Sequence, residues 1–84
     1  MKYYVYILKS IKTGKFYIGQ TQNLNSRLKK HNAGYNKSTK NDIPWEIIFF
    51  IPFDSRKEAF AEEKRLKSLK KRQAILNFIQ QNKL

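Results

Sequence analysis

The first part of the chain has the pattern of a two-stranded hairpin. Residues 3–9 are almost all β-branched or aromatic, which is typical of a strand. They are apolar at consecutive positions, so this strand is expected to lie in the centre of a sheet. Gly14 lies in a polar turn at residues 12–15 and can adopt a positive φ there. Residues 16–19 are therefore predicted to form the return strand.

The spacing of apolar residues becomes helical after the hairpin. Leu24 and Leu28 are four residues apart, and Asn23 in front of them fits the N-cap position. These features predict a helix over residues 22–32. A polar loop rich in Asn, Lys, Ser and Thr follows at residues 32–43.

The second half of the chain predicts one more strand and two helices. The apolar and aromatic run at residues 45–53 reads as a third strand. Ser55 and Glu58 form a capping box, which indicates a helix that continues to about residue 69. A last helix is predicted over residues 72–81. The order β-β-α-β-α-α predicts an α+β fold with a three-stranded, mostly antiparallel sheet flanked by helices.

Length and composition restrict the classes of protein. A chain of 84 residues has room for one domain, which we expect to span residues 1–84. It has no cysteine, which excludes disulfides and thiolate metal sites and suits a reducing compartment. No signal peptide or membrane-length apolar segment is found, so we expect a cytoplasmic protein with no membrane partner.

The charge is distributed unevenly along the chain. The formal net charge is +12, and all six acidic residues follow residue 41, whereas the first 41 residues carry nine Lys or Arg. A surface of one sign favours a polyanion, because each neutralised phosphate releases counterions. Nucleic acid is therefore the expected partner. A generic basic surface, as in ribosome-associated proteins, is the alternative.

Two predicted helices carry polar residues on their apolar faces. Arg27 and His31 share the sheet-facing side with Leu24 and Leu28 at 100° per residue. Glu63 falls near the centre of the apolar stripe of the next helix. Burial of a carboxylate is unfavourable unless it is paired or binds a cation. Two interpretations stay open. In the first, Arg27 and Glu63 form a buried ion pair or extend their charged ends to solvent. In the second, Arg27, His31 and Glu63 line a site for phosphate and metal.

Two strand tyrosines extend this pattern. If the hairpin pairs across its turn, Tyr6 and Tyr17 lie near each other on one face of the sheet. Gly19 then leaves open space beside them, where a backbone could approach. Tyrosines in strands usually serve packing alone, so the pair supports a site only together with the polar residues on the helices.

The ordered set of these residues resembles the GIY-YIG nuclease family. Val5-Tyr6-Ile7 and Tyr17-Ile18-Gly19 are similar to the paired signature of the family, although Val5 replaces its first glycine. The run from Tyr17 to His31 is similar to the YIG-x-T-x-N-L-x-x-R-L-x-x-H pattern. Further likeness lies at residues 37–45 and 58–67. The resemblance covers nearly the whole chain, and it is strongest to the small single-domain branch, which is related to the N-terminal domain of the bacterial excision-repair incision subunit.

The resemblance implies a metal-dependent endonuclease that hydrolyses phosphodiester bonds in DNA. It implies one Mg²⁺ or Mn²⁺ per site, held by Glu63 and water. Arg27 would hold a phosphate oxygen, Tyr6 would take the proton of the attacking water, and Tyr17 would position water or phosphate. His31 would assist proton transfer or bind phosphate. Nearby cations are expected to lower the phenol pKa for this role.

The resemblance also suggests residues around the site. Some relatives carry an asparagine on the last helix that supports the site, and Asn77 is the nearest candidate. Four lysines flank the proposed site and are expected to grip neighbouring phosphates: Lys29, Lys30, Lys37 and Lys40.

Other functions stay open from the sequence. The chain has no attached targeting domain, which favours low or partner-dependent activity, with a homodimer or a separate targeting protein as candidate partners. In a bacterium the protein is expected to associate with the nucleoid. The alternative is a nucleic-acid-binding module of the same fold with little or no cleavage. A third interpretation, a ribosome- or RNA-associated structural protein, is supported by charge alone.

Overall fold

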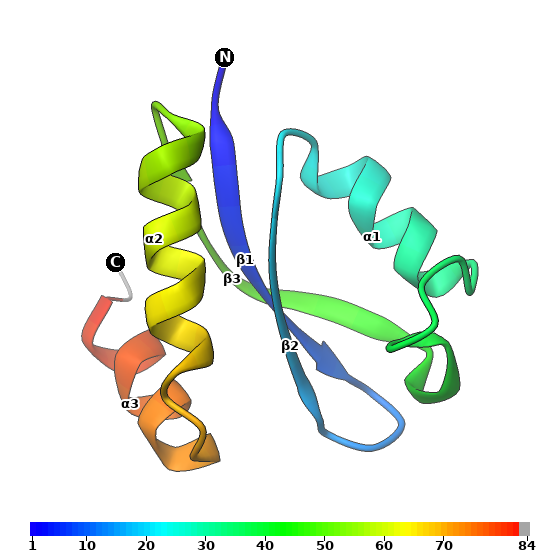
Figure 1. Cartoon of the computed structure of the whole chain (residues 1–84). Coiled ribbons are helices and arrows are strands. Elements are labelled where there is room, and N and C mark those ends of the chain that lie inside the picture. The colour runs from blue at the N-terminus through cyan, green and yellow to red at the C-terminus, as the bar shows by residue number, and fades with distance from the viewer. Residues whose placement is uncertain (83–84) are drawn as a thin grey trace.

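The computed structural model describes residues 1–82 and has a twisted sheet with helices on both faces (Figure 1). The elements are β1 (Tyr3–Ser10), β2 (Phe16–Thr21), α1 (Leu24–Asn32), a 3-10 turn (Lys40–Asp42), β3 (Trp45–Phe53), α2 (Arg56–Lys67) and α3 (Arg72–Asn82). This order confirms the predicted α+β fold.

The sheet is antiparallel throughout, with the strand order β2-β1-β3. β1 is the central strand, as its continuous apolar run predicts. Tyr6 pairs with Gly19 on β2 and with Phe50 on β3. β2 therefore forms an open edge of the sheet, and this edge carries the second half of the paired tyrosine signature.

Each face of the sheet has its own apolar core. Side chains at alternate positions of β1, including Val5 and Ile7, pack under α2 and α3 with Leu66 and Phe78. The other positions of β1, together with Trp45 and residues of α1, form a second cluster on the opposite face. In Figure 1, α2 and α3 lie on one side of the sheet, and α1 with its following loop lies on the other.

The helices begin where their capping residues predict. The Asn23 side chain accepts a hydrogen bond from the backbone N–H of Ser26, and the Ser55 side chain accepts one from the backbone N–H of Glu58 and donates to the Glu58 carboxylate. α2 ends at Lys67, two residues before the predicted end. β2 extends to Thr21, two residues beyond its predicted end. These differences leave the predicted topology unchanged.

The segment between α1 and β3 is held firmly on the sheet. The Asn32 side chain donates to the Trp45 carbonyl at 3.1 Å and accepts from its N–H at 2.7 Å. The Ser10 hydroxyl donates to the Asp42 carbonyl at 2.6 Å. This polar segment is consequently fixed next to α1. None of the helices in the described part of the chain is long and apolar enough to cross a membrane.

Candidate active site

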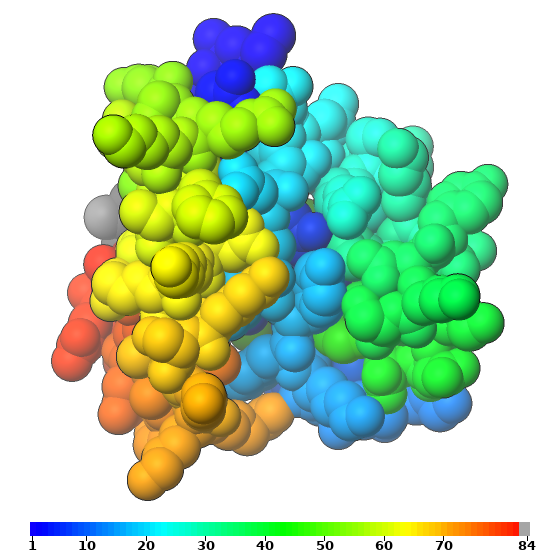
Figure 2. Space-filling model, in the orientation of Figure 1, coloured from blue at the N-terminus to red at the C-terminus, as the bar shows by residue number. Residues whose placement is uncertain are grey.

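The side chain of Tyr6 reaches from the central strand across the neighbouring edge strand. Its register partner is Gly19, and a Cβ at Gly19 would lie 2.6 Å from the Tyr6 hydroxyl oxygen. The hydroxyl therefore lies directly over the glycine. The sequence-based expectation of open space beside Gly19 is wrong, because the phenol of Tyr6 fills it. Figure 2 shows atoms of β1 at the floor of a hollow between β2 and α1.

A chain of hydrogen bonds runs through the Tyr6 hydroxyl. Arg27 Nε donates to it at 3.4 Å, and His31 Nε2 lies 3.0 Å from it. His31 Nδ1 lies 2.9 Å from the Thr39 hydroxyl, which in turn donates to the Asn36 carbonyl at 3.4 Å. Tyr6, His31 and Thr39 are buried. The arrangement joins a strand, a helix and a loop into one polar network beneath the surface.

The donors and acceptors of this network favour one histidine tautomer. The Thr39 hydroxyl is placed to donate to the Asn36 carbonyl, and in that arrangement its oxygen accepts from His31 Nδ1–H. In a neutral imidazole, Nε2 is then the acceptor, and the Tyr6 hydroxyl donates to it. Tyr6 is consequently oriented to hand its proton to His31, and its oxygen faces the Arg27 guanidinium.

Burial controls the ionisation of both partners. Burial raises the pKa of the Tyr6 hydroxyl above its ordinary value of 10.0, and this effect exceeds the lowering by the hydrogen bond and charge of Arg27. The nearby Tyr17 and Glu63 raise that pKa further. Burial, followed by the charge of Arg27, lowers the pKa of His31 below 6.5. Arg27 does lower the pKa of Tyr6, as a nearby cation is expected to, but the net shift is upward, so the expectation of a lowered Tyr6 pKa is wrong.

Tyr17 lies beside this network on the same face of the sheet. Its ring centroid is 6.4 Å from that of Tyr6 and 4.9 Å from that of His31. The centroid of the Trp45 ring is 6.4 Å from that of Tyr17, in an edge-on contact. Tyr17 is half-buried and lies on the edge strand. The structure therefore brings both signature tyrosines, Arg27 and His31 together.

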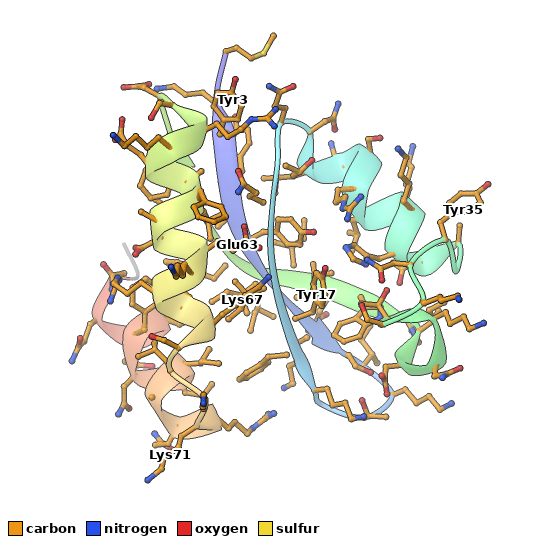
Figure 3. All side chains as sticks on the ribbon, in the orientation of Figure 1. Tyr3, Tyr17, Tyr35, Glu63, Lys67 and Lys71 are labelled. Carbon is orange, nitrogen blue, oxygen red and sulfur yellow. The ribbon has the colours of Figure 1, made fainter. Side chains whose placement is uncertain are left out.

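Glu63 approaches from the other face of the edge strand. Its Oε1 accepts a hydrogen bond from Gln20 Nε2 at 3.0 Å, and Gln20 shares the face of β2 that carries Ile18 under α2. Tyr17 points to the opposite face. Figure 3 shows Glu63 and Tyr17 on either side of β2. Because β2 is an edge strand, the carboxylate and the tyrosines flank one open sheet edge rather than a single face.

The Glu63 carboxylate is partly exposed and paired with a lysine rather than sealed in the core. Lys67 Nζ lies 2.7 Å from its Oε2, and the exposed fractions of the Lys67 and Glu63 side chains are 54% and 15%. The alternative of a buried Arg27–Glu63 ion pair is therefore wrong. Arg27 bonds to Tyr6 instead, and an exposed lysine neutralises Glu63.

The surroundings of Glu63 fit a hydrated Mg²⁺ or Mn²⁺ ion. Mg²⁺ takes oxygen ligands, keeps several waters and often binds only one or two carboxylates. Glu63 provides one such carboxylate at a partly exposed edge of the sheet, where it pairs with the Lys67 ammonium. In residues 1–82, no three His, Asp or Glu side chains form a dedicated metal cage. The donor set therefore fits a metal that substrate oxygens and water complete.

The predicted phosphate-binding lysines are all exposed, but they differ in position. Lys30 and Lys37 line a pocket of about 280 Å³ together with Arg27 and His31. Lys29 lines the adjoining depression on α1. Lys40 lies in the 3-10 turn beyond this pocket. Lys30 and Lys37 therefore lie nearest to the network.

Asn77 is not brought to the network. It lies exposed on α3, where its carbonyl oxygen accepts a hydrogen bond from Gln73 at 3.0 Å.

Three contacting residues were missed by the sequence reasoning. Thr39 holds His31, Gln20 holds Glu63, and Lys67 neutralises Glu63. Lys67 had a signal, because an acid and a lysine four residues apart on a helix usually pair. Thr39 and Gln20 lie in segments that resemble the family, but a loop residue and an edge-strand amide carry no periodicity that indicates their contact partners.

Replacement of Gly19 tests the close approach of Tyr6. In Gly19→Ala the added methyl carbon would lie 2.6 Å from the hydroxyl oxygen and 2.8 Å from Cζ of Tyr6. The phenol is buried and cannot move away freely, so we expect destabilisation of roughly 1–3 kcal/mol in urea denaturation. A shifted His31 resonance in NMR spectra should accompany it. Unchanged stability would show that the Tyr6 ring moves aside easily.

The pH dependence of stability tests the ionisation of His31, which is the only histidine in the chain. Its pKa is lowered in the folded protein, so below about pH 6.5 the unfolded chain binds a proton that the folded protein refuses. The free energy of unfolding should therefore fall as the pH drops from about 6.5 through the lower folded pKa. Urea denaturation of the protein and of His31→Gln between pH 5.5 and 7.5 checks this, because the variant should lose that slope.

Comparisons with known proteins bear on the family and the fold of this chain. The family model described as the GIY-YIG catalytic domain matches residues 2–77. A UPF0213 protein of Clostridium perfringens is 38% identical over 73 residues, covering 86% of this chain and 77% of that protein. A UPF0213 protein of Streptococcus pneumoniae is 37% identical over 82 residues, covering 96% and 81%.

A solved structure supports the same fold. The solution NMR structure of the UPF0213 protein BH0048 from Bacillus halodurans matches with a TM-score of 0.62 and 32% sequence identity. The match covers 98% of this chain and 86% of that protein.

Proposed function

Because this chain belongs to the GIY-YIG family, we propose that it is a metal-dependent endonuclease that hydrolyses phosphodiester bonds in DNA. Family membership alone supports a nuclease-type hydrolase that acts on nucleic acid. The identity of the residues, the metal and the preference for DNA are parts of the proposal. The observation that supports it most is the buried hydrogen-bond chain from Arg27 through Tyr6 to the neutral His31.

Tyr6 and His31 act together as the base in this proposal. The attacking water gives a proton to the Tyr6 oxygen while the Tyr6 hydroxyl proton moves to His31 Nε2. His31 then carries the positive charge, and its Nδ1–H stays on Thr39. With ordinary pKa values of 10.0 for tyrosine and 6.5 for histidine, moving the Tyr6 proton to His31 alone is unfavourable by roughly 5 kcal/mol. Burial widens the difference between the two pKa values. The neutral pair is therefore the resting state, and proton transfer accompanies attack on phosphorus.

The cationic side chains bind and orient the phosphate. Arg27 is half-buried, and its bond to Tyr6 uses only Nε–H, so the other guanidinium donors are available for a non-bridging oxygen. Lys30 and Lys37, on the rim of the adjoining pocket, are suited to the neighbouring phosphates. A phosphate bound in this way lies next to Arg27, so the Arg27 guanidinium contacts both a phosphate oxygen and the Tyr6 hydroxyl.

Glu63 is the proposed metal-holding residue at the edge of β2. A bound Mg²⁺ or Mn²⁺ would supply Lewis-acid stabilisation of the phosphoryl and leaving oxygens. Lys67 would compete with that ion for the Glu63 carboxylate, and its ammonium would otherwise be suited to pair with phosphate. Gln20 keeps the carboxylate directed toward the sheet edge.

The alternative function is a nucleic-acid-binding module with little or no cleavage. Two observations favour it: Lys67 neutralises Glu63, and burial raises the pKa of the Tyr6 hydroxyl above its ordinary value. The same basic surface around Arg27 would then only hold phosphates.

Cleavage assays separate the two functions. Single-stranded, duplex and branched DNA are incubated with the protein in Mg²⁺, in Mn²⁺ and in EDTA. The endonuclease proposal requires cleavage that depends on the divalent ion. Binding without cleavage in both metals would support the binding module instead, and cleavage that persists in EDTA would contradict the proposed role of Glu63.

A further inference from the structure

A second groove adjoins the candidate active site on the other face of the edge strand. It has a volume of about 640 Å³ and lies between the start of β1, the end of β2 and the first turns of α2. Figure 3 shows Tyr3 and Glu63 on this same side of β2. Six of its lining residues matter here: Tyr3, Gln20, Gln22, Arg56, Lys57 and Phe60.

The groove presents an aromatic surface that the fold does not use. Phe60 lies on α2 and is 58% exposed, although a large apolar side chain gains by burial. Tyr3 forms another wall, and the Arg56 guanidinium lies 5.6 Å from the centroid of its ring. Flat aromatic rings beside a guanidinium form a surface on which a nucleobase stacks.

The charge of the groove specifies the occupant further. Arg56 and Lys57 contribute two cations, Gln20 and Gln22 contribute amides, and no acid lines it in the described chain. A second copy of this chain, with its net charge of +12, would be repelled here. A phosphate pairs with the cations, and the amides suit the edges of an unpaired base.

The groove is continuous with the candidate active site. Gln20 lines the groove and also donates to the Glu63 carboxylate. Phe60 and Glu63 are three residues apart on α2, so their Cβ atoms lie roughly 5–6 Å apart on one side of the helix. A strand whose phosphodiester lies at Glu63 would therefore place its neighbouring nucleotide at Phe60.

We propose that this groove is a nucleotide subsite, in which an unpaired base stacks on Phe60 while Arg56 and Lys57 bind its phosphate. This rests on the proposed nucleic-acid function and makes it specific, because a base within a duplex is covered by its neighbours and cannot stack on Phe60. The substrate is therefore a strand that is unpaired next to the cleaved bond.

Binding measurements without cleavage test the subsite. Fluorescence anisotropy in EDTA compares a labelled oligodeoxythymidine with a hairpin duplex. Phe60→Ala should weaken binding to the single strand by about 5- to 100-fold, the range expected for the loss of one base–aromatic stack. Phe60→Tyr should restore it. Phe50→Ala, which removes another exposed ring on β3, is the matched control and should change binding by less than about twofold.

The outcomes distinguish this inference from the proposed function. On a strand of abasic residues, Phe60→Ala and the unmodified protein should bind equally. Equal weakening of duplex and single strand, an effect no larger than that of Phe50→Ala, or a change of oligomeric state in sedimentation would overturn the subsite. Phe60-dependent binding without metal-dependent cleavage would leave the subsite standing and reject the endonuclease. Metal-dependent cleavage that Phe60→Ala leaves unchanged would reject the subsite and leave the endonuclease proposal standing.

Discussion

Tyr6→Phe is expected to lower the rate of DNA cleavage by roughly 10²- to 10⁴-fold, the range over which a general base contributes. The variant keeps the aromatic ring and removes only the hydroxyl between Arg27 and His31. Single-turnover kinetics on a labelled strand should show the loss in the chemical step, with strand affinity nearly unchanged.

The same substitution has a structural effect that can be measured separately. His31 Nε2 is left without a partner in a site where His31 is 1% exposed, and a buried unpaired acceptor is unfavourable by about 1–3 kcal/mol. Urea denaturation reports this term. Cleavage is then compared at temperatures where both proteins are folded, so that unfolding does not mimic lost chemistry.

Tyr17→Phe is the matched control for the choice of base. Tyr17 lies 6.4 Å from Tyr6 between ring centroids and packs against the same histidine, but it is half-buried on the edge strand. We expect its hydroxyl to position water or phosphate, with a loss smaller than that of Tyr6→Phe. If Tyr17→Phe abolished cleavage while Tyr6→Phe retained it, the general base would be Tyr17, and the Tyr6–His31 pair would only stabilise the fold.

The parts of the fold that sequence could predict are those with periodicity or local capping chemistry. The continuous apolar run of β1 indicates a central strand. Side chains alternate between the two faces along each strand, and this alternation places the rings of Tyr6 on β1 and Tyr17 on β2 on the same face. Asn23 and Ser55 mark two helix starts because each side chain caps its own first turn. These signals involve residues close together in the sequence, so they can be recognised without knowledge of the tertiary structure.

The parts that sequence could not predict depend on how the sheet edge is built. Helical periodicity indicates that Glu63 faces the sheet, but it does not indicate that α2 lies on the face opposite Tyr6 and Arg27. The convergence of Glu63 with the tyrosines requires β2 to be an edge strand, which is a property of strand order. The Thr39 contact to His31 arises from a loop without a repeating pattern. Positive charge along the sequence suggests a lowered pKa for Tyr6, but burial of its hydroxyl raises that pKa, and burial depends on the tertiary structure.

Glu63→Gln is the second substitution with a large expected effect. It removes the proposed metal-holding charge while it keeps the shape of the side chain and its reach to Gln20. A bound metal ion supplies several kcal/mol of transition-state stabilisation, so cleavage in Mg²⁺ should fall by roughly 10²- to 10⁴-fold. Strand binding in EDTA should stay the same or become tighter, because a negative charge near the phosphates is lost.

Glu62→Gln is the matched control for this charge. Glu62 is the next residue on α2, and its side chain is 17% exposed and pairs with Arg65 at 2.6 Å. It should leave cleavage unchanged, because its carboxylate is engaged away from Gln20 and Lys67. Both substitutions remove a partly exposed helical ion pair, which contributes only about 0.3–0.5 kcal/mol, so both variants should fold.

Two further readouts connect Glu63 to the tyrosine without any cleavage assay. Mn²⁺ should broaden the imidazole resonances of His31 in the unmodified protein and in Glu62→Gln, but not in Glu63→Gln. The Glu63 charge is also one of the groups that raise the pKa of Tyr6, so Glu63→Gln should lower that pKa in an ultraviolet titration. If Glu63→Gln cut DNA in Mg²⁺ as fast as Glu62→Gln, the carboxylate would be a structural partner of Lys67 and Gln20, and the metal would have to be held elsewhere.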